Sequence, residues 1–364
     1  MTGIAALRAD PRLRWVGVAL VAIALIALPF VLAMAGTAWV RITNFAILFV
    51  LLSLGLNIVV GFAGLLDLGY IAFYAVGAYT YALLASPHFG LHLPFWIILP
   101  IGAAVACLFG VLLGAPTLKL RGDYLAIVTL GFGEIVRIFM NNLSDPINIT
   151  NGPKGLATID PIRVSTLGID FGQTAHIGSL AISSTIQYYF FLLIVMMAVI
   201  VINLRLQNSR IGRAWEAIRE DEMAARAMGI NTTRIKLLAF AMGASFGGVA
   251  GGMFSAIQGF VSPESFSLTE SVMVLAMVVL GGMGNIWGVV VGAVLLSFVP
   301  EILRYTVQPA QIALFGHSII DPEILRMLVF GFARVRMMLF RPAGLVPSAV
   351  RKREFAVSED GAGK

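Results

Sequence analysis

Apolar stretches long enough to cross a lipid bilayer recur along almost the whole chain. A membrane-spanning helix needs about 20 apolar residues, and the bilayer interior admits only helices and closed barrels because every backbone polar group must be satisfied there. Only 12% of the 364 residues are charged, against about 25% in soluble domains. We therefore predict an all-α polytopic membrane protein with about ten transmembrane or membrane-embedded helices. The candidate spans lie near 16–35, 40–60, 66–85, 95–114, 124–140, 186–204, 235–258, 269–283, 285–303 and 325–340.

The first apolar run, Val16–Met34, shares some features with a secretory signal. Arg8, Arg12 and Arg14 precede it, and Ala33-Met34-Ala35 resembles a cleavage site. The run is too long for the core of a typical signal peptide. We expect it to remain as the first span, after a cytoplasmic tail of residues 1–15.

The distribution of Lys and Arg predicts the orientation, because cytoplasmic loops carry an excess of both. Ten spans with a cytoplasmic N-terminus put the polar segment 205–234 and a tail of residues 348–364 inside, so both termini are expected in the cytoplasm. The net charge of +6 then belongs to these loops, and we expect contact with membrane lipid and none with nucleic acid. The basic residues placed inside are Lys119, Arg121, Arg205, Arg210, Arg213, Arg341, Arg351, Lys352 and Arg353.

The longest segment placed outside is 141–185, which is not apolar enough to span. It contains Asn151-Gly152-Pro153 and Asp160-Pro161, which favour turns and loops. We expect a periplasmic loop that helps to receive a partner, within a membrane domain covering 16–347.

The charged segment from Ser209 to Asn231 interrupts two long apolar stretches. Ile211, Trp215 and Ile218 recur at helical spacing, the acidic triplet 220–222 breaks this stripe, and Ala224, Ala225 and Met228 resume it. Gly229 is suited to end a helix. We predict two short amphipathic helices along the membrane surface with a bend at the triplet. The periodicity leaves open whether they form an ordinary cytoplasmic loop or a docking element.

Glycines at four-residue spacing predict two closely packed helices, because small residues let helix backbones approach each other within a bilayer. Gly-containing motifs at 59–64 and 280–284 also resemble each other faintly, which raises the further expectation of two repeated halves. The spaced glycines are Gly243, Gly247 and Gly251 on one helix, and Gly284, Gly288 and Gly292 on the other.

Few polar residues fall within the predicted spans, where such residues are costly and often functional. Asn57, Asp67, Tyr70 and Glu134 are candidates for lining a translocation pathway. Interhelical hydrogen bonding is the alternative for Asn57. Helix capping or a place at the cytoplasmic interface is the alternative for Asp67. Glu134 and Arg137 are three residues apart on one helix and can pair, as can Glu301 and Arg304. Glu264 and Glu270 are placed near the outer mouth.

Several motifs in order resemble the permeases of ABC importers for branched-chain amino acids, of the LivM type. The segment from Gly212 to Asn231 resembles the cytoplasmic coupling loop of these permeases. The resemblance covers roughly 55–347. The other matching motifs are Asn57–Gly64 with Leu68-Gly69-Tyr70, Leu120–Tyr124 through Thr129–Glu134, Thr150–Leu156, Gly281–Asn285 and Arg341–Leu345.

This resemblance implies one half of a transmembrane pair in the cell inner membrane. Its expected partners are a second permease subunit, two ABC ATPase subunits and a periplasmic substrate-binding protein. The coupling loop would fit a cleft on an ATPase subunit, and nucleotide chemistry would belong to that partner, since the chain has no G-x-x-x-x-G-K-[ST] motif. No cofactor and no catalytic role are expected. The residues that the resemblance assigns to coupling are Gly212, Arg213, Trp215, Glu216, Ala217, Ala224, Ala225 and Gly229.

Other functions remain as alternatives at this stage. A permease of the same family for urea or short amides fits the same motifs. An ion-coupled secondary transporter needs carboxylates deep in the bundle, for which Asp67 and Glu134 are the candidates, but it has no need of the polar segment. A membrane-embedded enzyme has little support, because the histidines fall in predicted outer loops without a Cys or carboxylate cluster. They are His88, His92, His176 and His317.

Overall fold

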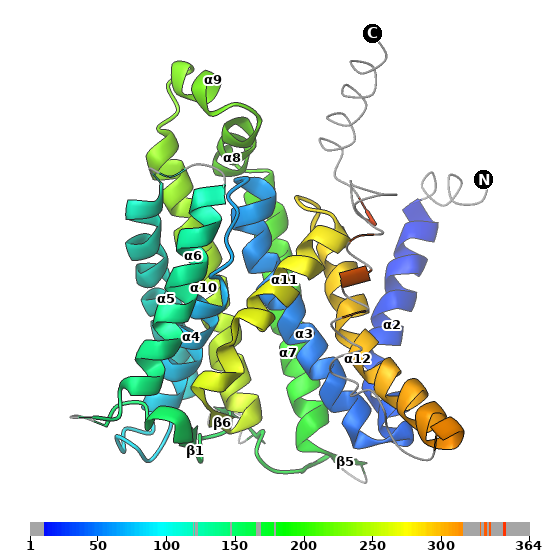
Figure 1. Ribbon diagram of the computed structural model, residues 1–364. Coiled ribbons are helices and arrows are strands. Elements are labelled where there is room, and N and C mark those ends of the chain that lie inside the picture. The colour runs from blue at the N-terminus through cyan, green and yellow to red at the C-terminus, as the bar shows by residue number, and fades with distance from the viewer. Residues whose placement is uncertain are drawn as a thin grey trace.

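The computed structural model describes residues 11–118, 120, 123–145, 148–164, 169–177 and 180–315, together with 328, 331, 332, 335, 345 and 346. Its principal elements are long helices arranged as a bundle (Figure 1). They are α2 (Pro11–Ala35), α3 (Thr37–Leu56), α4 (Ile71–Leu84), α5 (Phe95–Thr117), α6 (Asp123–Asn142), α7 (Ser184–Gln207), α10 (Thr232–Gln258), α11 (Leu268–Gly281) and α12 (Ile286–Phe315). Two short helices, α8 (Arg210–Glu220) and α9 (Glu222–Ala227), cap one end.

Seven helical segments of the described chain are long and apolar enough to cross a membrane, and two shorter apolar helices, Ala19–Ala35 and Ile71–Leu84, accompany them. The chain is thus an all-α polytopic membrane protein by fold class. Nine of the ten predicted spans coincide with helices, while most of the tenth, 325–340, lies outside the described residues. Lys119, Arg121, Arg341, Arg351, Lys352, Arg353, residues 1–10 and the tail 348–364 also lie outside them.

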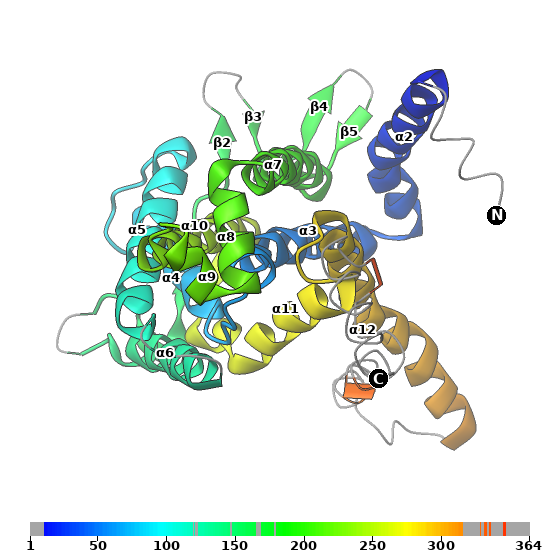
Figure 2. The ribbon, with the colours of Figure 1, turned by 90° about the horizontal axis from the view of Figure 1, so that it is seen from above.

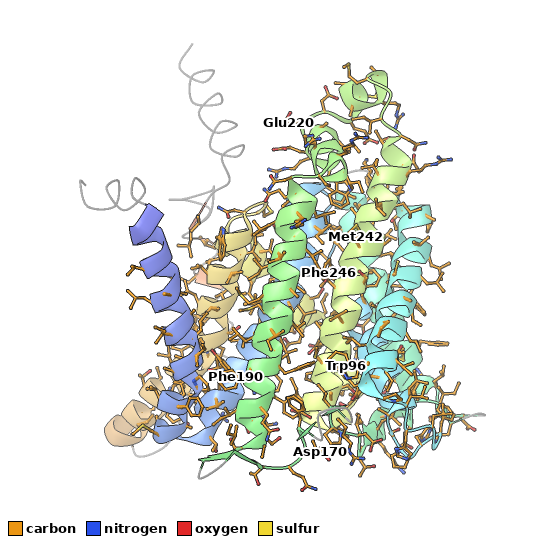
Figure 3. All side chains as sticks on the ribbon, turned by 180° about the vertical axis from the view of Figure 1, so that it is seen from behind. Trp96, Asp170, Phe190, Glu220, Met242 and Phe246 are labelled. Carbon is orange, nitrogen blue, oxygen red and sulfur yellow. The ribbon has the colours of Figure 1, made fainter. Side chains whose placement is uncertain are left out.

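Large apolar side chains cover the outside of the bundle, as a bilayer requires. Leu108 and Leu112 of α5, Ile135 of α6 and Ile194 of α7 are all more than half exposed. Trp96, near one end of α5 (Figure 3), is similarly exposed, at the level where aromatic residues are enriched in membrane proteins. A protein with so apolar a surface would aggregate in water, whereas this surface is the one expected for helices that contact lipid.

Helix α10 lies in the middle of the bundle, and its glycines allow close packing. A Cβ at Gly251 would overlap the Tyr74 carbonyl oxygen of α4, and a Cβ at Gly243 would lie 2.5 Å from a Val59 methyl carbon. Gly247 faces Phe73 at 3.1 Å. Any larger side chain on this stripe would push α10 away from α3 and α4.

Helices α11 and α12 also cross closely, at Gly281, Gly288 and Gly292, where added Cβ atoms would meet backbone atoms of the opposite helix. Gly284 does not belong to this stripe. The prediction that it shares a helix with Gly288 was wrong, because α12 begins at Ile286 and Gly284 lies in the preceding turn with φ of 82°. Glycine adopts this left-handed backbone without a Cβ penalty.

The segment 141–185, expected as a loop, contains short antiparallel strands that the sequence did not indicate. β1 (Leu156–Ala157) pairs with β6 (Phe260–Val261), β2 (Arg163–Val164) with β3 (Ile169–Asp170), and β4 (Ala175–Ile177) with β5 (Leu180–Ile182). These strands lie at the end of the bundle opposite α8 and α9, as the positions of Asp170 and Glu220 illustrate (Figure 3). Strands of two or three residues carry too little alternation to be read from a pattern.

Candidate functional site

The polar segment folds as two short helices with a break at the acidic triplet, which confirms that prediction. Asp221 has extended backbone angles between α8 and α9, and its carboxylate accepts hydrogen bonds from the N–H groups of Met223 and Ala224. This is the N-cap geometry for α9. Gly229 follows α9 with φ of 86°. Seen from above, α8 and α9 lie across the end of the bundle (Figure 2).

The predicted coupling residues divide into two groups by exposure. Gly212, Trp215 and Ala225 are buried and attach the helices to the bundle; the Trp215 indole N–H donates to the Ile235 carbonyl of α10 at 2.7 Å. Ala217 is partly buried. Arg213, Glu216, Ala224 and Gly229 are exposed and available to a partner.

The apolar stripe does not continue through α9 as predicted. Ala225 is buried, but Ala224 is exposed and Met228 is 83% exposed. The helix ends at Ala227, so Met228 leaves the helical face that its spacing had suggested. Met223 is 63% exposed as well. Two flexible apolar side chains on an otherwise charged surface are suited to contact with another protein.

Arg219 connects this surface to the interior of the bundle. Its guanidinium donates to the Gly61 carbonyl at 2.7 Å. The stem of the same side chain lies against Gly64, where a Cβ would come within 2.8 Å of the Arg219 Cγ. A movement of α8 would therefore act directly on residues 61–64.

Residues 61–64 end a helix of unusual geometry. Asn57–Phe62 form a π-helix, η1, which continues α3, and π-helical turns are frequent at functional sites. Asn57 is fully buried, and its side-chain oxygen accepts from the Gly284 N–H at 2.9 Å. The Gly284 carbonyl in turn accepts from the Gln207 amide of α7 at 3.5 Å. Asn57 thus joins η1 to the turn between α11 and α12.

Between η1 and α4 the chain runs without helix from Ala63 to Tyr70, so the predicted span 66–85 is shortened. Helix α4 has 14 residues, or about 21 Å at 1.5 Å per residue, which is shorter than the roughly 30 Å bilayer core. Neighbouring helices hold the preceding non-helical segment, Ala63–Tyr70, inside the bundle. The Leu68 N–H donates to the Thr129 hydroxyl of α6, and the Ser271 hydroxyl of α11 donates to the Leu68 carbonyl at 2.5 Å.

Asp67 and Tyr70 belong to this broken segment and are both buried. One Asp67 oxygen accepts from the Gly69 N–H at 2.9 Å and forms the turn before α4; the other is buried with no hydrogen-bond partner among the described residues. The Tyr70 hydroxyl donates to the Gly243 carbonyl of α10 at 2.9 Å. Both side chains fix the path of the chain.

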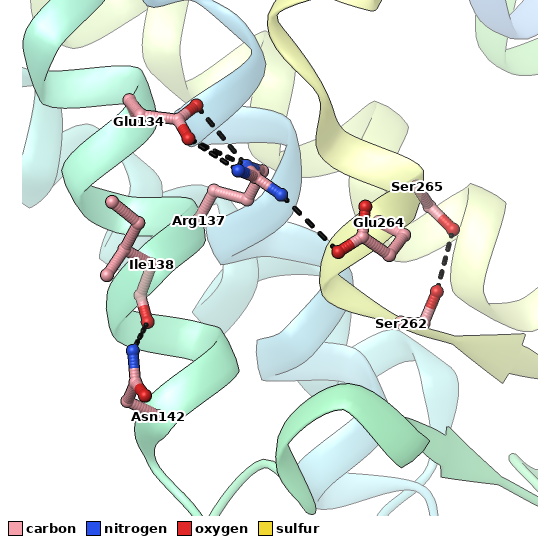
Figure 4. A network of polar contacts seen from close by, with 7 residues as sticks. All are labelled: Glu134, Arg137, Ile138, Asn142, Ser262, Glu264 and Ser265. Atoms are coloured by element: carbon pink, nitrogen blue, oxygen red, sulfur yellow. Dashed lines mark hydrogen bonds and ion pairs between the residues drawn. The ribbon is translucent and has the colours of Figure 1, made fainter.

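Glu134 forms the predicted pair with Arg137, with 2.5 Å between a carboxylate oxygen and the guanidinium Nη2. Arg137 also reaches Glu264, on the 3₁₀ turn η4 (Pro263–Phe266), at 3.4 Å (Figure 4). This second contact was not predicted from the sequence. It fastens to α6 the turn η4, which contributes Ser265 to the lining of a cavity.

That cavity, of about 240 Å³, lies between α3, α4, α10, η4 and α11. Asn57, Asp67, Tyr70 and Glu134 are not among the described residues that line it. Most of its wall is apolar, and Glu270 is the acidic side chain among the described residues that line it. The lining residues are Phe45, Leu48, Phe49, Leu52, Ile71, Tyr74, Phe254, Ser265 and Glu270.

A helix that is broken inside an apolar bundle, with an element outside the bundle attached to the break, is typical of a membrane transport subunit. Comparison with known proteins identifies the family. The family described as "Branched-chain amino acid transport system / permease component" matches residues 38–333, and the chain belongs to this family.

Similar individual proteins support the same family assignment. The "High-affinity branched-chain amino acid transport system permease protein LivM" of Escherichia coli K12 is 45% identical over 335 residues, covering 88% of this chain and 72% of the relative. The LivM protein of Salmonella typhimurium is 44% identical, covering 85% and 70%. The LivH permease of Escherichia coli K12 is 32% identical over 99 residues, 27% of this chain and 32% of that protein. No solved structure matches the chain.

Proposed function

We propose that this chain is a permease subunit of an ATP-driven importer for branched-chain or other hydrophobic amino acids in the cell inner membrane. The observation that carries the proposal is the Arg219–Gly61 contact, which ties an exposed docking element to a broken helix inside the bundle. ATP hydrolysis belongs to two partner ATPase subunits, and a periplasmic binding protein delivers the substrate. The likeness to both LivM and LivH proteins supports pairing with a second, related permease.

In this proposal the end of the bundle that bears α8 and α9 is cytoplasmic. The start of α2 lies at the same end (Figure 1), which supports a cytoplasmic N-terminus, and the predicted ten spans return the C-terminus to that side. The strand-bearing end then faces the periplasm, where the segment 141–185 can receive the binding protein.

The proposed residue roles follow the geometry. Arg213, Glu216, Ala217, Ala224 and Gly229, together with the exposed Met223 and Met228, form the contact surface for the ATPase. Gly212, Trp215 and Ala225 hold that surface on the bundle. Asn57, Asp67, Tyr70 and Glu134 position the pathway, since each makes at least one hydrogen bond within the protein. The close approaches at the remaining glycines keep the helices packed: Gly243, Gly247, Gly251, Gly288 and Gly292, with Gly284 in the turn.

The docking role can be tested by changing the exposed surface without touching its attachment. Met228→Glu and Glu216→Arg should reduce co-purification of the ATPase subunits, because each places an unsuitable charge on the proposed contact surface. Met228→Leu keeps an apolar side chain of similar size and should behave as wild type. If both charge variants retain the ATPase and full uptake, α8 and α9 are not the docking element.

The substrate class needs a separate experiment. The permease pair, its ATPase subunits and its binding protein, reconstituted in liposomes, should accumulate labelled leucine and not urea. Uptake should disappear with an ATPase subunit unable to hydrolyse ATP and should survive dissipation of the ion gradients. Uptake that follows the ion gradients instead would make the chain a secondary transporter.

A further inference from the structure

Helix α6 is the least embedded of the candidate spans. Only 22% of its most apolar stretch is buried, the smallest share among the seven candidate spans of the described chain. Ile127 and Ile138 are half exposed or more. Together with α11, the helix lies along one side of the bundle, while α7 lies on another (Figure 2). Most of α6 must therefore be covered by lipid or by a second protein.

The exposed side of α6 carries charge as well as apolar side chains. Glu134 follows Ile127 by two helical turns and precedes Ile138 by one, so the three residues share one stripe of the helix. The Glu134 side chain is 39% exposed. It lies about 12 Å before the end of α6 at Asn142, at 1.5 Å per residue. Since α6 is about as long as the hydrocarbon core is thick, this carboxylate lies within the depth of the core.

Glu134 belongs to a cluster with more negative than positive charge. Arg137 bonds to it and also reaches Glu264 of η4 (Figure 4), and the Glu264 side chain is 69% exposed. Two carboxylates thus share one guanidinium. Charged groups in membrane spans almost always face protein or water, because hydrocarbon cannot solvate them. Lipid tails are therefore unsuited to cover this side of α6.

The non-helical segment Ala63–Tyr70 leads to the same conclusion. It runs between α6 and α11, where the Leu68 N–H donates to the Thr129 hydroxyl and the Ser271 hydroxyl donates to the Leu68 carbonyl. Leu68 is only partly buried there. Irregular backbone is not found against lipid within the hydrocarbon region. Two independent features on one side of the bundle thus require a cover of protein or water.

We propose that the second permease subunit packs against this surface, the α6 face, formed by Ile127, Glu134 and Ile138 of α6 with Glu264 of η4. The second subunit places a basic or hydrogen-bond-donating side chain against Glu264. Such a subunit is itself an apolar helical protein, so it covers the isoleucines as lipid would. Unlike lipid, it can also supply a donor to the excess carboxylate. The proposal deepens the proposed function and rests on the pairing of two permeases stated there.

Site-specific photocrosslinking tests which side of the bundle contacts the partner. A benzophenone amino acid in place of Ile127 or Ile138, in the full chain co-expressed with an epitope-tagged second permease and the ATPase subunits, should crosslink to the tagged permease. Ile194 of α7 is at least as exposed and is the matched control, from which no such crosslink should form. Equal crosslinking from all three positions, or crosslinking from position 194 alone, would overturn the assignment. A crosslink to a differently tagged copy of this chain would overturn the choice of partner.

Charge reversal tests the chemistry of the contact. Glu264→Lys should lower the amount of second permease that co-purifies with this chain about tenfold, because the donor on the partner loses its acceptor and meets a like charge. Glu264→Gln should have a smaller effect. Lys154→Glu reverses an exposed charge at the same end of the bundle and should leave the pair intact. The ATPase subunits should co-purify with every variant, which shows that the chain is folded. Wild-type pairing of the Glu264→Lys variant would overturn the role of Glu264.

Cysteine labelling distinguishes a protein contact from a wall that faces water. Cys107 is the single cysteine, so Ile138→Cys in a Cys107→Ala background places one thiol on the α6 face. In the assembled pair this thiol should resist a membrane-impermeant methanethiosulfonate. Rapid modification would make the face the wall of a water-filled passage and would overturn the contact.

Failure of this inference can be told apart from failure of the proposed function. A pair that assembles and takes up leucine while it crosslinks through α7 overturns the α6 face alone. If wild type binds neither a second permease nor the ATPase subunits, the proposed function fails instead.

Discussion

The Asn57 side-chain oxygen accepts a hydrogen bond from the Gly284 backbone N–H at 2.9 Å, across 227 positions of sequence. This bond joins η1 to the turn between α11 and α12. Gly61 lies beside it, since a Cβ there would be 2.6 Å from the Gly284 nitrogen. The two Gly-containing motifs that resemble each other in the sequence thus meet in the structure.

Asn57→Leu should destabilise the permease by about 1–3 kcal/mol, because the buried Gly284 N–H loses its acceptor. Thermal unfolding in detergent measures the change. Asn203→Leu is a suitable comparison, since the Asn203 amide bonds only to Val199 of its own helix among the described contacts. An Asn57 variant as stable as wild type would show that the turn does not depend on this bond.

Arg219→Ala should uncouple ATP hydrolysis from uptake. The hydrogen bond from its guanidinium to the Gly61 carbonyl is charge-assisted and worth about 1.5–3 kcal/mol, whereas the exposed contact surface of α8 and α9 stays intact. Co-purification of the ATPase should therefore persist while leucine uptake per ATP falls. Arg234→Ala removes an exposed basic residue at the start of α10 and should leave coupling unchanged. Loss of the ATPase from the Arg219 variant would instead assign this residue to docking.

Lys236 and Glu222 should make the attachment of α9 sensitive to pH. Their side chains are 2.6 Å apart, and Lys236 is only 10% exposed. Burial raises the pKa of Glu222, but the hydrogen bond and charge of Lys236 outweigh it and hold the pKa below its usual value. The stabilisation is therefore complete above the unfolded pKa of about 4.3 and is lost as pH falls through the lower folded pKa.

Hydrogen exchange of α9 measures this effect. Protection should decrease on acidification from pH 6 toward pH 3, and Glu222→Gln should lower it by about 1–2 kcal/mol at pH 6 with a weaker response to acid. If wild type and the Gln variant show the same profile, the ion pair does not hold α9.

Gly251→Ala should destabilise the bundle by about 1–3 kcal/mol through overpacking, because the new methyl group would overlap the Tyr74 carbonyl oxygen. Gly131 of α6 is the matched control: a Cβ there meets nothing within 4 Å. Gly131→Ala should be neutral or stabilising, since Ala favours helix by about 1 kcal/mol over Gly. The yield of monodisperse protein and its melting temperature distinguish the two, and equal behaviour would contradict the close-packing role.

What the sequence could predict was local. The break at the acidic triplet 220–222, the position of Gly229 and the Glu134–Arg137 pair all depend on residues within a few positions of one another. The contacts of Arg219 with Gly61 and of Arg137 with Glu264 depend on how helices distant in sequence are placed. Met228 shows where prediction from helical periodicity fails. It lies one residue beyond the end of α9, so its side chain leaves the helical face and is exposed to solvent.

The cavity was beyond prediction for the same reason. Its lining comes from five elements, and most of its residues are apolar side chains that look like ordinary core in one dimension. Glu270 alone stood out, and its charge indicated only a position near the outer mouth.

The acceptor of the Arg219 contact is a main-chain oxygen, so no exchange of side chain at position 61 can delete it. A side-chain substitution can therefore remove the hydrogen bond between the docking surface and the broken helix only at Arg219. A screen for uncoupled variants can sever it at Arg219, whereas compensating changes must act on the backbone path around Gly61. During evolution, residue 219 can change and so alter this contact, whereas the carbonyl group at position 61 is present whatever residue occupies that position.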